Sequence, residues 1–318
     1  MVESKAVAGV PLMGQELGAS TIKPIYSNAN MECRKTVLER RMSRAKQKKM
    51  NETSHEGGKG KSSQFKMKTN RLVLLRHGES EFNLENKFCG WHDAPLTENG
   101  EREACMVASP ALLQSKLDFD VVYTSVLDRS KKSAELILSN MNRAYVPTKA
   151  DWRLCERHYG NLTGFRKREI ANIYGEDQVQ AWRRGYDDVP PEINTENRYY
   201  YVIRNNPIFD DVPAGQFPMT ESLGMCVDRV EPVWKEIKQE VLNGTRVLIC
   251  VHGTVTRALV KHIEGVSKEA IQKVNIPNSI PRVYEFNMKT GELVGGPINL
   301  GDPEYIKKKT AQVAAIGD

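Results

Sequence analysis

The sequence predicts an α/β fold: a doubly wound, mainly parallel sheet with helices on both faces. Three short apolar runs, at 72–75, 119–123 and 246–251, have the length and composition of strands that are buried on both faces. Stretches with helical patterning separate these runs. Strands that alternate with helices are typical of a parallel sheet that helices cover on both sides.

The helices are expected at defined places. Thr97 can cap a helix that continues to about Gln114. Residues 128–140 and 166–184 predict two further helices, and another is expected directly after His252-Gly253.

The clearest helical pattern lies at 223–241. Its apolar residues recur at alternating steps of four and three, which places them on one stripe: Leu223, Val227, Val230, Trp234, Ile237 and Val241. Thr220 or Ser222 can cap the start of this helix, and Asn243-Gly244 can end it. Before it, residues 187–218 contain five prolines and predict a long irregular loop, which in a compact domain is usually functional.

The positive charge of the chain is concentrated at its N-terminal end. Residues 1–70 hold 14 of the 46 Lys+Arg and 6 of the 40 Asp+Glu, a balance of +8, and residues 71–318 have a balance of −2. Residues 1–70 also lack an apolar pattern, which predicts a basic, disordered arm before a domain at 71–318. A nearly neutral body argues against nucleic-acid binding. Within the arm, Gly60-Lys61-Ser62 resembles the end of a phosphate-binding loop, but the upstream glycine and the preceding strand are missing.

Composition argues against several classes of protein. The mean hydropathy is −0.51, and no run of about 18 apolar residues is present, so a transmembrane helix is not expected. The six cysteines are scattered without a CxxC pair, which favours reduced thiols over a zinc ribbon or a disulfide scaffold. No apolar signal segment follows Met1. We therefore expect a cytoplasmic protein that has no membrane partner.

Histidine and arginine residues stand at the ends of the predicted strands. The run at 72–75 leads into Arg76-His77-Gly78, and the run at 246–251 leads into His252-Gly253. Arg129 follows the run at 119–123 by a few residues. Because ligands bind beyond the carboxyl ends of strands in open α/β sheets, these side chains are expected to converge. A lone histidine is most often structural, but two His-Gly turns after buried strands favour a functional site.

This combination fits a phosphoryl-transfer site. Arginine offers paired donors to phosphate oxygens, and helix N-termini add backbone N–H groups. A neutral imidazole is a good nucleophile near neutral pH, and a second histidine with further arginines would stabilise the transferring group. Glu156 lies among Arg153, Arg157 and His158, and is either a structural salt-bridge partner or a proton donor and acceptor.

At these positions the sequence resembles the histidine phosphatase superfamily. The opening motif is Arg76-His77-Gly78-Glu79-Ser80, followed by Asn83, Phe88 and Gly90-Trp91. More narrowly, the chain is similar to the cofactor-dependent phosphoglycerate mutases from about Arg71 to its end. Other matching stretches are Glu156-Arg157-His158-Tyr159-Gly160, Ala181-Trp182-Arg183-Arg184 and Val260-Lys261-His262-Ile263-Glu264-Gly265. The segment from about 301 resembles the mobile tail of that family.

The resemblance implies an activity and the residues that carry it. His77 would be the phosphohistidine nucleophile, primed by 2,3-bisphosphoglycerate; Glu156 would donate and accept the proton; His252 would support the phosphoryl group. The reaction would interconvert 3-phosphoglycerate and 2-phosphoglycerate in glycolysis and gluconeogenesis, without a metal. A homodimer is expected, because family members are usually dimers or tetramers. The phosphates and the carboxylate would be held by Arg76, Asn83, Cys89, Gly90, Arg129, Arg157, Tyr159, Lys167, Arg183, Arg184, Gly253 and Thr254.

Several positions depart from the family pattern. Cys89 stands where a serine is typical, and a thiol is a weaker hydrogen-bond donor than a hydroxyl. Thr254 replaces an asparagine, and Asn278-Ser279 replaces a Thr-Gly pair. Phe82 replaces a tryptophan. Asp128 replaces a lysine, which would place a negative charge near the phosphate pocket. The pattern indicates a divergent member whose ligand contacts have been altered.

Two alternatives stay open. If water attacks the phosphohistidine, the protein is a histidine phosphatase, or a bisphosphoglycerate mutase or phosphatase, that hydrolyses a small phosphorylated metabolite. The changes at Cys89 and Thr254 favour this, because a poorly held glycerate would escape. Alternatively, the protein is a non-catalytic interaction protein that uses the basic arm. The presence of His77, Glu156 and His252 together argues against that reading.

Overall fold

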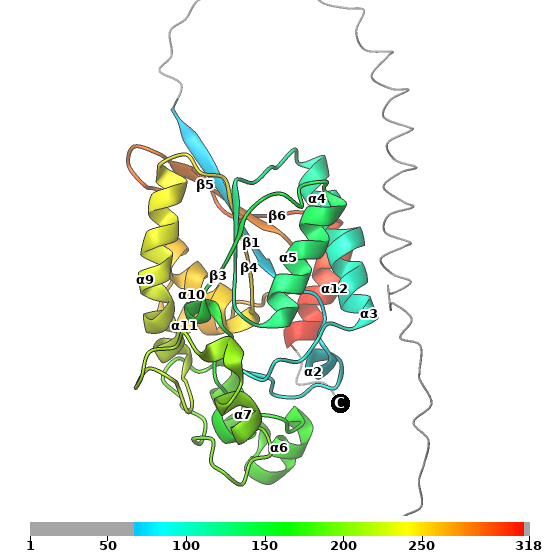
Figure 1. Ribbon diagram of the computed structural model, residues 1–318, viewed down its shortest axis with the longest axis vertical. Coiled ribbons are helices and arrows are strands. Elements are labelled where there is room, and N and C mark those ends of the chain that lie inside the picture. The colour runs from blue at the N-terminus through cyan, green and yellow to red at the C-terminus, as the bar shows by residue number, and fades with distance from the viewer. Residues whose placement is uncertain (1–66, 315–318) are drawn as a thin grey trace, which may run out of the picture.

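The computed structural model describes residues 67–314, and its centre is one six-stranded sheet (Figure 1). The strand order is β3-β2-β4-β1-β5-β6. The first four strands of that order are parallel, as in the register Leu74↔Ile249 between β1 and β4, and β5 and β6 are antiparallel additions at one edge. The strands are β1 (Thr69–Arg76), β2 (Val121–Thr124), β3 (Thr148–Ala150), β4 (Val247–Val251), β5 (Arg282–Asn287) and β6 (Ile298–Asn299).

Helices cover both faces of this sheet (Figure 1). One face is covered by α9 (Leu223–Leu242) and α10 (Gly253–Glu264), followed by the short α11 (Lys268–Gln272). The other face is covered by α3 (Glu98–Glu103), a π-helical turn at Ala104–Ala108, α4 (Ser109–Gln114) and α5 (Asp128–Asn140). The predicted doubly wound α/β architecture is confirmed.

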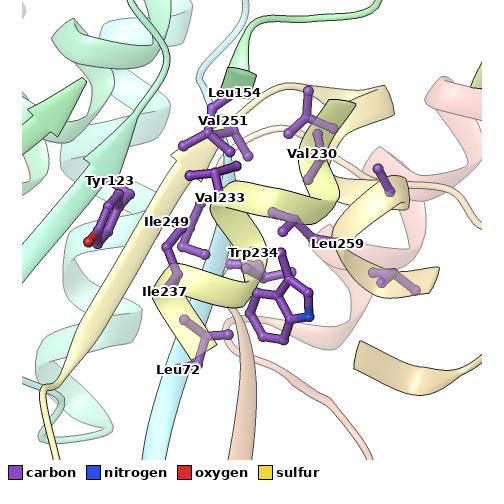
Figure 2. Packing of buried hydrophobic residues seen from close by; sticks show 14 of the residues in the cluster. Leu72, Tyr123, Leu154, Val230, Val233, Trp234, Ile237, Ile249, Val251 and Leu259 are labelled. Atoms are coloured by element: carbon purple, nitrogen blue, oxygen red, sulfur yellow. The ribbon is translucent and has the colours of Figure 1, made fainter. Parts of the chain in front are cut away.

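The core under α9 shows why the sequence folds in this way. Trp234 and Ile237 from α9 pack onto Ile249 of β4 and Leu72 of β1, and Leu259 of α10 closes the cluster (Figure 2). All of these side chains are buried. The apolar stripe predicted for this helix is therefore the surface that packs on the sheet, and burial of such side chains is the main favourable term in folding.

The predicted strands and the missed ones differ in burial. All three predicted strands are present, and β2 and β4 are buried along their whole length. The sequence analysis missed β3, β5 and β6. β3 lies at one edge of the sheet and its three residues are exposed, and β5 mixes buried with partly exposed positions. Neither has the continuous apolar run by which the other strands were identified.

The predicted helices are present, but one of them is divided in two. The helix expected at 166–184 is two helices, α6 (Lys167–Tyr174) and α7 (Glu176–Arg184), because Gly175 between them has φ +86°. Ser222 caps α9 by accepting a hydrogen bond from the N–H of Met225. Thr220, the other candidate, instead donates to the carbonyl oxygen of Pro190.

The chain between α5 and α9 gathers at the carboxyl end of the parallel strands (Figure 1). α6 and α7 lie there, with the short α2 (Glu81–Leu84) from the other end of the sequence. The loop predicted at 187–218 is largely irregular, and contains α8 (Tyr200–Arg204) and a 3₁₀ turn at Pro207–Phe209. Aromatic side chains of this loop, including Tyr199 and Phe209, form a small separate core. This end of the sheet is where ligands bind in α/β folds.

The last described element is α12 (Pro303–Ala314), which lies on the α3 side of the sheet (Figure 1). No helix within residues 67–314 is long and apolar enough to cross a bilayer. The predicted basic arm, including Gly60-Lys61-Ser62, lies almost entirely outside the described residues; β1 begins at Thr69.

Candidate active site

The two histidines that follow β1 and β4 lie side by side. Their ring centroids are 5.0 Å apart in an edge-to-face arrangement, although 175 positions separate His77 from His252 in the sequence. The parallel pairing of β1 with β4 brings them together, and the N–H of His77 donates to the carbonyl oxygen of Val251 at 2.9 Å. A Cβ added to Gly78 would lie 2.2 Å from the carbonyl oxygen of Gly100, so only glycine allows the turn after His77 to approach α3 this closely.

His77 is held as a neutral ring, and one of its nitrogens has no hydrogen-bond partner among residues 67–314. Its Nδ1 lies 2.6 Å from the carbonyl oxygen of Gly78, which requires a proton on Nδ1. Nε2 therefore carries the lone pair. Burial, followed by the charges of Arg129 and Arg76, lowers the pKa of His77 well below 6.5. The imidazole is thus neutral at neutral pH, and its Nε2 is unprotonated, as nucleophilic attack on phosphorus requires.

His252 lies behind His77 and is fully buried. Its Nε2 is 2.7 Å from the hydroxyl of Ser125, the residue that follows β2. Its Nδ1 has no hydrogen-bond partner in the described structure. Burial and the nearby Arg129 lower the pKa of His252 well below 6.5. A hydroxyl that donates to Nε2 would leave Nδ1 as the protonated nitrogen, available to an incoming acceptor.

Glu156 is held by backbone N–H groups and not by an arginine. Its Oε1 accepts hydrogen bonds from the N–H of Arg157 at 2.8 Å and from the N–H of Thr254 at 3.1 Å. Thr254 lies in the first turn of α10, where unpaired N–H groups favour an acceptor. The salt-bridge reading of Glu156 is therefore not the arrangement found, and the carboxylate faces the same cavity as His77.

His77 and Glu156 line one cavity of about 200 Å³ at the carboxyl end of the sheet. Among the described residues, five arginines and three lysines contribute to its wall, together with two glutamates. The predicted site residues that line it are Arg76, His77, Asn83, Cys89, Gly90, Arg129, Glu156, Tyr159, Lys167, Arg183, Arg184, Gly253 and Thr254. Residues more than 170 positions apart in sequence thus form one strongly cationic pocket, which suits a ligand with several negative charges.

Two predicted site residues lie behind the cavity wall. His252 is one of them. The other is Arg157, whose guanidinium lies 4.6 Å from the ring centroid of Tyr159 and donates to the carbonyl oxygen of Arg183 at 2.9 Å. Arg157 is fully buried and does not line the cavity. Arg157 supports the ring of Tyr159 and the backbone of Arg183 from behind. The structure therefore shows no direct access of Arg157 to a phosphate in the cavity.

Cys89, one of the altered positions, lines the cavity, but its thiol proton points to a backbone carbonyl and not into the cavity. The Sγ atom donates to the carbonyl oxygen of His92 at 3.3 Å. Burial raises the pKa of Cys89, which keeps the thiol neutral. Phe82 is a packing residue that contacts His92 and Tyr199.

Asp128 is exposed and does not line the cavity, although its neighbour Arg129 does. Its backbone N–H donates to Asp93 at 2.7 Å. The side chain of Arg129 points inward and donates to the carbonyl oxygens of His92 and Gly90, each at 2.8 Å. Because Asp128 begins α5 and leaves the cavity side to Arg129, the expected negative charge at the pocket is absent.

Asn278 and Thr254 both line the cavity, from different loops. The Asn278 side-chain amide donates to the carbonyl oxygen of His77 at 2.8 Å and so fixes the turn that carries this histidine. Ser279 has φ +56°, a left-handed conformation that favours glycine, and its buried hydroxyl has no partner.

Sequence reasoning missed several residues at the cavity. Arg257 lines it from α10, one helical turn after Gly253, and burial together with Arg184 lowers its pKa to about 9. The spacing of four residues was the available signal. Ser125, which contacts His252 behind the cavity wall, was also missed. From α12 come Lys309, Gln312 and Val313.

α12 is tied to the cavity wall at two points. The Nζ of Lys309 pairs with the buried carboxylate of Glu103 at 2.5 Å, and Arg184 donates to the carbonyl oxygen of Val313 at 2.8 Å. The other oxygen of Glu103 accepts from the N–H of Glu79, two residues after His77. The segment predicted as a mobile tail thus contains a helix that covers one side of the cavity; its mobility stays a prediction.

The fold and this cationic site belong to a known superfamily of enzymes. The family model of the histidine phosphatase superfamily (branch 1) matches residues 72–214 and 205–295, and the chain belongs to this superfamily. Among curated proteins, it is 42% identical over 255 residues to the 2,3-bisphosphoglycerate-dependent phosphoglycerate mutase of Hamiltonella defensa subsp. Acyrthosiphon pisum (strain 5AT). That alignment covers 79% of this chain and 99% of the relative.

Solved structures confirm the fold. The mycobacterial glucosyl-3-phosphoglycerate phosphatase matches with a TM-score of 0.53 and 18% identity, over 71% of this chain and 96% of that one. The alpha-ribazole phosphatase from Shigella flexneri matches with a TM-score of 0.52 and 21% identity, over 73% and 96%. At these identities the likeness concerns the fold alone.

Proposed function

We propose that this protein is a phosphoglycerate mutase that interconverts 3-phosphoglycerate and 2-phosphoglycerate through a phosphohistidine at His77. The observation that carries the proposal is the state of His77: Nδ1 bonded to a carbonyl oxygen, Nε2 free, and the ring held neutral beside arginines. The similarity to a 2,3-bisphosphoglycerate-dependent mutase over most of the chain supports it. The proposed setting is glycolysis and gluconeogenesis in the cytoplasm.

In the proposed reaction, Nε2 of His77 attacks the phosphorus atom while the leaving oxygen departs on the opposite side. His252 supports the phosphoryl group with its remaining ring nitrogen, Nδ1. Arg76 and Arg129 stabilise the charge on the equatorial oxygens, as fixed donors do in phosphoryl transfer. Arg129 is already fixed by two hydrogen bonds to backbone carbonyls, so it needs little reorganisation when the ligand binds.

Glu156 is proposed to move the proton of the glycerate hydroxyl. It gives a proton to the oxygen that leaves phosphorus and takes one from the hydroxyl that attacks. The N–H groups of Arg157 and Thr254 hold its carboxylate in place. Because both donors come from the backbone, the replacement of asparagine by threonine at 254 leaves this contact intact.

The cavity fits the implied primer, 2,3-bisphosphoglycerate, whose role when bound is to supply the phosphoryl group to His77. Buried donor atoms around the cavity have no partner in the described structure, namely Nε of Arg76 and Nη1 of Arg184. Such orphaned donors are costly unless a ligand satisfies them. The anionic groups would be held by Arg76, Asn83, Cys89, Gly90, Arg129, Tyr159, Lys167, Arg183, Arg184, Gly253 and Thr254.

The test is to incubate the full chain with 3-phosphoglycerate and a trace of 2,3-bisphosphoglycerate, and to follow 2-phosphoglycerate and inorganic phosphate together. We expect 2-phosphoglycerate, dependent on the bisphosphate, and none from His77→Ala. His262→Asn is a matched control, because that histidine bonds to a backbone carbonyl on the far side of α10. Release of phosphate alone would make the protein a phosphatase. No product from folded protein would leave a non-catalytic role.

A homodimer is proposed from the same resemblance. Sedimentation equilibrium of the purified chain tests it, because a dimer has twice the 35.9 kDa mass of the chain. A single species at the monomer mass over the micromolar range would contradict it.

A further inference from the structure

Three lysines of the described residues line the cavity, and one of them lacks an acidic partner. Lys309 pairs with Glu103, and Lys87 pairs with Glu85. The Nζ of Lys167 instead donates to the side-chain oxygen of Asn86 at 2.7 Å, and within residues 67–314 no carboxylate forms an ion pair with it. A neutral amide oxygen stabilises an ammonium group less than a carboxylate does.

The surroundings of Lys167 are positive on several sides. Arg183 and Arg184 approach it from α7, and Arg76 approaches it from the end of β1. Lys167 is also the first residue of α6, where the helix dipole is positive. Burial, followed by these arginines, lowers the pKa of Lys167 to about 7. At neutral pH, Lys167 is then the neutral, nucleophilic amine in roughly half of the molecules.

We propose that Lys167 is a site of covalent acylation by small acyl phosphates, the mixed anhydrides of a carboxylic acid and phosphoric acid. The neighbouring arginines bind the phosphate end of such a molecule, and this places its acyl carbon within a cavity of about 200 Å³ that Lys167 shares. An acyl donor without a phosphate has no such anchor. The proposal rests on the cavity and its charges, and not on the mutase reaction.

The step balances without a further reactant. The lone pair of Nζ attacks the acyl carbon and forms the N–C bond of an amide. The C–O bond to phosphate breaks, and its electron pair leaves with inorganic phosphate, whose charge the arginines stabilise. The amine proton passes to phosphate or to water. The product lacks the positive charge of Lys167 and fills part of the cavity, so a modified molecule binds anionic ligands less well.

A bound ligand would prevent this reaction in two ways. It would occupy the space that the acyl phosphate needs, and its negative charges would favour the ammonium form of Lys167. Acylation is therefore a property of the ligand-free cavity.

The experiment treats the full chain with acetyl phosphate at pH 7 and quantifies acetylation of each lysine by peptide mass spectrometry. We expect Lys167 to be modified at least ten-fold faster than Lys309 and Lys87, the matched lysines of the same cavity. Inorganic phosphate or 3-phosphoglycerate should suppress the reaction at Lys167. An acetyl succinimidyl ester, which carries no phosphate, should lose most of this selectivity.

Asn86→Asp gives the sharpest variant, because it places a carboxylate at the position of the present amide oxygen. Aspartate tolerates the φ of +55° found at this residue. We expect acetylation of Lys167 to fall about ten-fold at pH 7. The pH profile of the unaltered protein gives an independent measure: labelling of Lys167 should reach half its plateau near pH 7, and that of other lysines above pH 9.

The proposal is wrong if Lys167 is labelled no faster than Lys309, if ligand gives no protection, or if its labelling still rises steeply above pH 9. These results can be read whether or not the protein turns over phosphoglycerate. Failure of the mutase assay with selective labelling of Lys167 would overturn only the proposed function.

Discussion

Replacing Arg229 by Met tests how the segment that carries Glu156 is held in place. Arg229 lies in α9 and is buried, and its guanidinium donates to both carboxylate oxygens of Glu221, at 2.6 and 2.9 Å. It also donates to the carbonyl oxygens of Arg153, Cys155 and Glu156, at 2.7, 2.9 and 3.3 Å. Glu221 in turn accepts from the N–H of His158 at 2.8 Å. One buried ion pair thus fixes the backbone on both sides of Glu156.

The expected cost follows from this burial. The two side chains are 8% and 3% exposed, and removal of one partner leaves the Glu221 carboxylate buried without its counter-charge. Such a change costs about 3–5 kcal/mol. For a domain of this size, that corresponds to a fall of roughly 6–20 °C in Tm. We also expect kcat/KM to fall at least ten-fold, because Glu156 loses its backbone anchor.

The assay is urea denaturation followed by tryptophan fluorescence, with kinetics on the same preparations. Arg246→Met is the control: Arg246 pairs with Asp120 on the surface, and its loss should cost less than about 1 kcal/mol. The double variant Arg229→Met with Glu221→Gln should be more stable than the sum of the single changes predicts. A cost below about 1 kcal/mol for Arg229→Met, or strictly additive single changes, would refute the reasoning.

Three further predictions follow from individual residues. Ser279→Gly should stabilise the fold by about 1 kcal/mol, because it relieves a left-handed serine and removes an unpartnered hydroxyl; a lower urea midpoint would contradict this. Lys309→Met should loosen α12, seen as faster amide exchange at 303–314, because it unpairs the buried Glu103; unchanged exchange would contradict it. Stability should fall as pH drops below 6.5, because burial lowers the pKa of His77, His158 and His252 and the unfolded chain binds protons more readily. His158, whose pKa is lowered to about 3, alone contributes about 1 kcal/mol of this loss at pH 5.5. A flat urea midpoint between pH 7 and 5.5 would contradict it.

The sequence was most informative where one residue type is physically required. The continuous apolar runs before His77 and His252 identified two central strands, because only strands buried on both faces lack polar positions. The His-Gly turns after them then indicated the site. Strand β5 was missed because it lies next to the short edge strand β6 and mixes buried with partly exposed residues. Its sequence therefore lacks the continuous apolar run of the central strands.

Contacts between distant side chains were beyond sequence reasoning. Arg257 was missed although it lines the cavity, and Arg157 was expected there although it lies behind Tyr159. Both are arginines in a basic neighbourhood, and local sequence does not tell which of them points into the cavity. That direction depends on the packing of α7, α9 and α10 around the end of the sheet.

The sequence by itself determined the fold class, the order of its main elements and the pair of histidines on which the proposed chemistry depends. Each of these follows from a local pattern, because burial on a sheet or at a turn restricts which residue types are tolerated. Only the tertiary structure decided that Asp128 faces away from the cavity. It also decided that, among residues 67–314, Nε2 of His77 has no hydrogen-bond partner and Lys167 has no acidic partner. Those properties are set by distances between residues far apart in the chain, and a charge or a hydrogen bond acts only over a few ångströms.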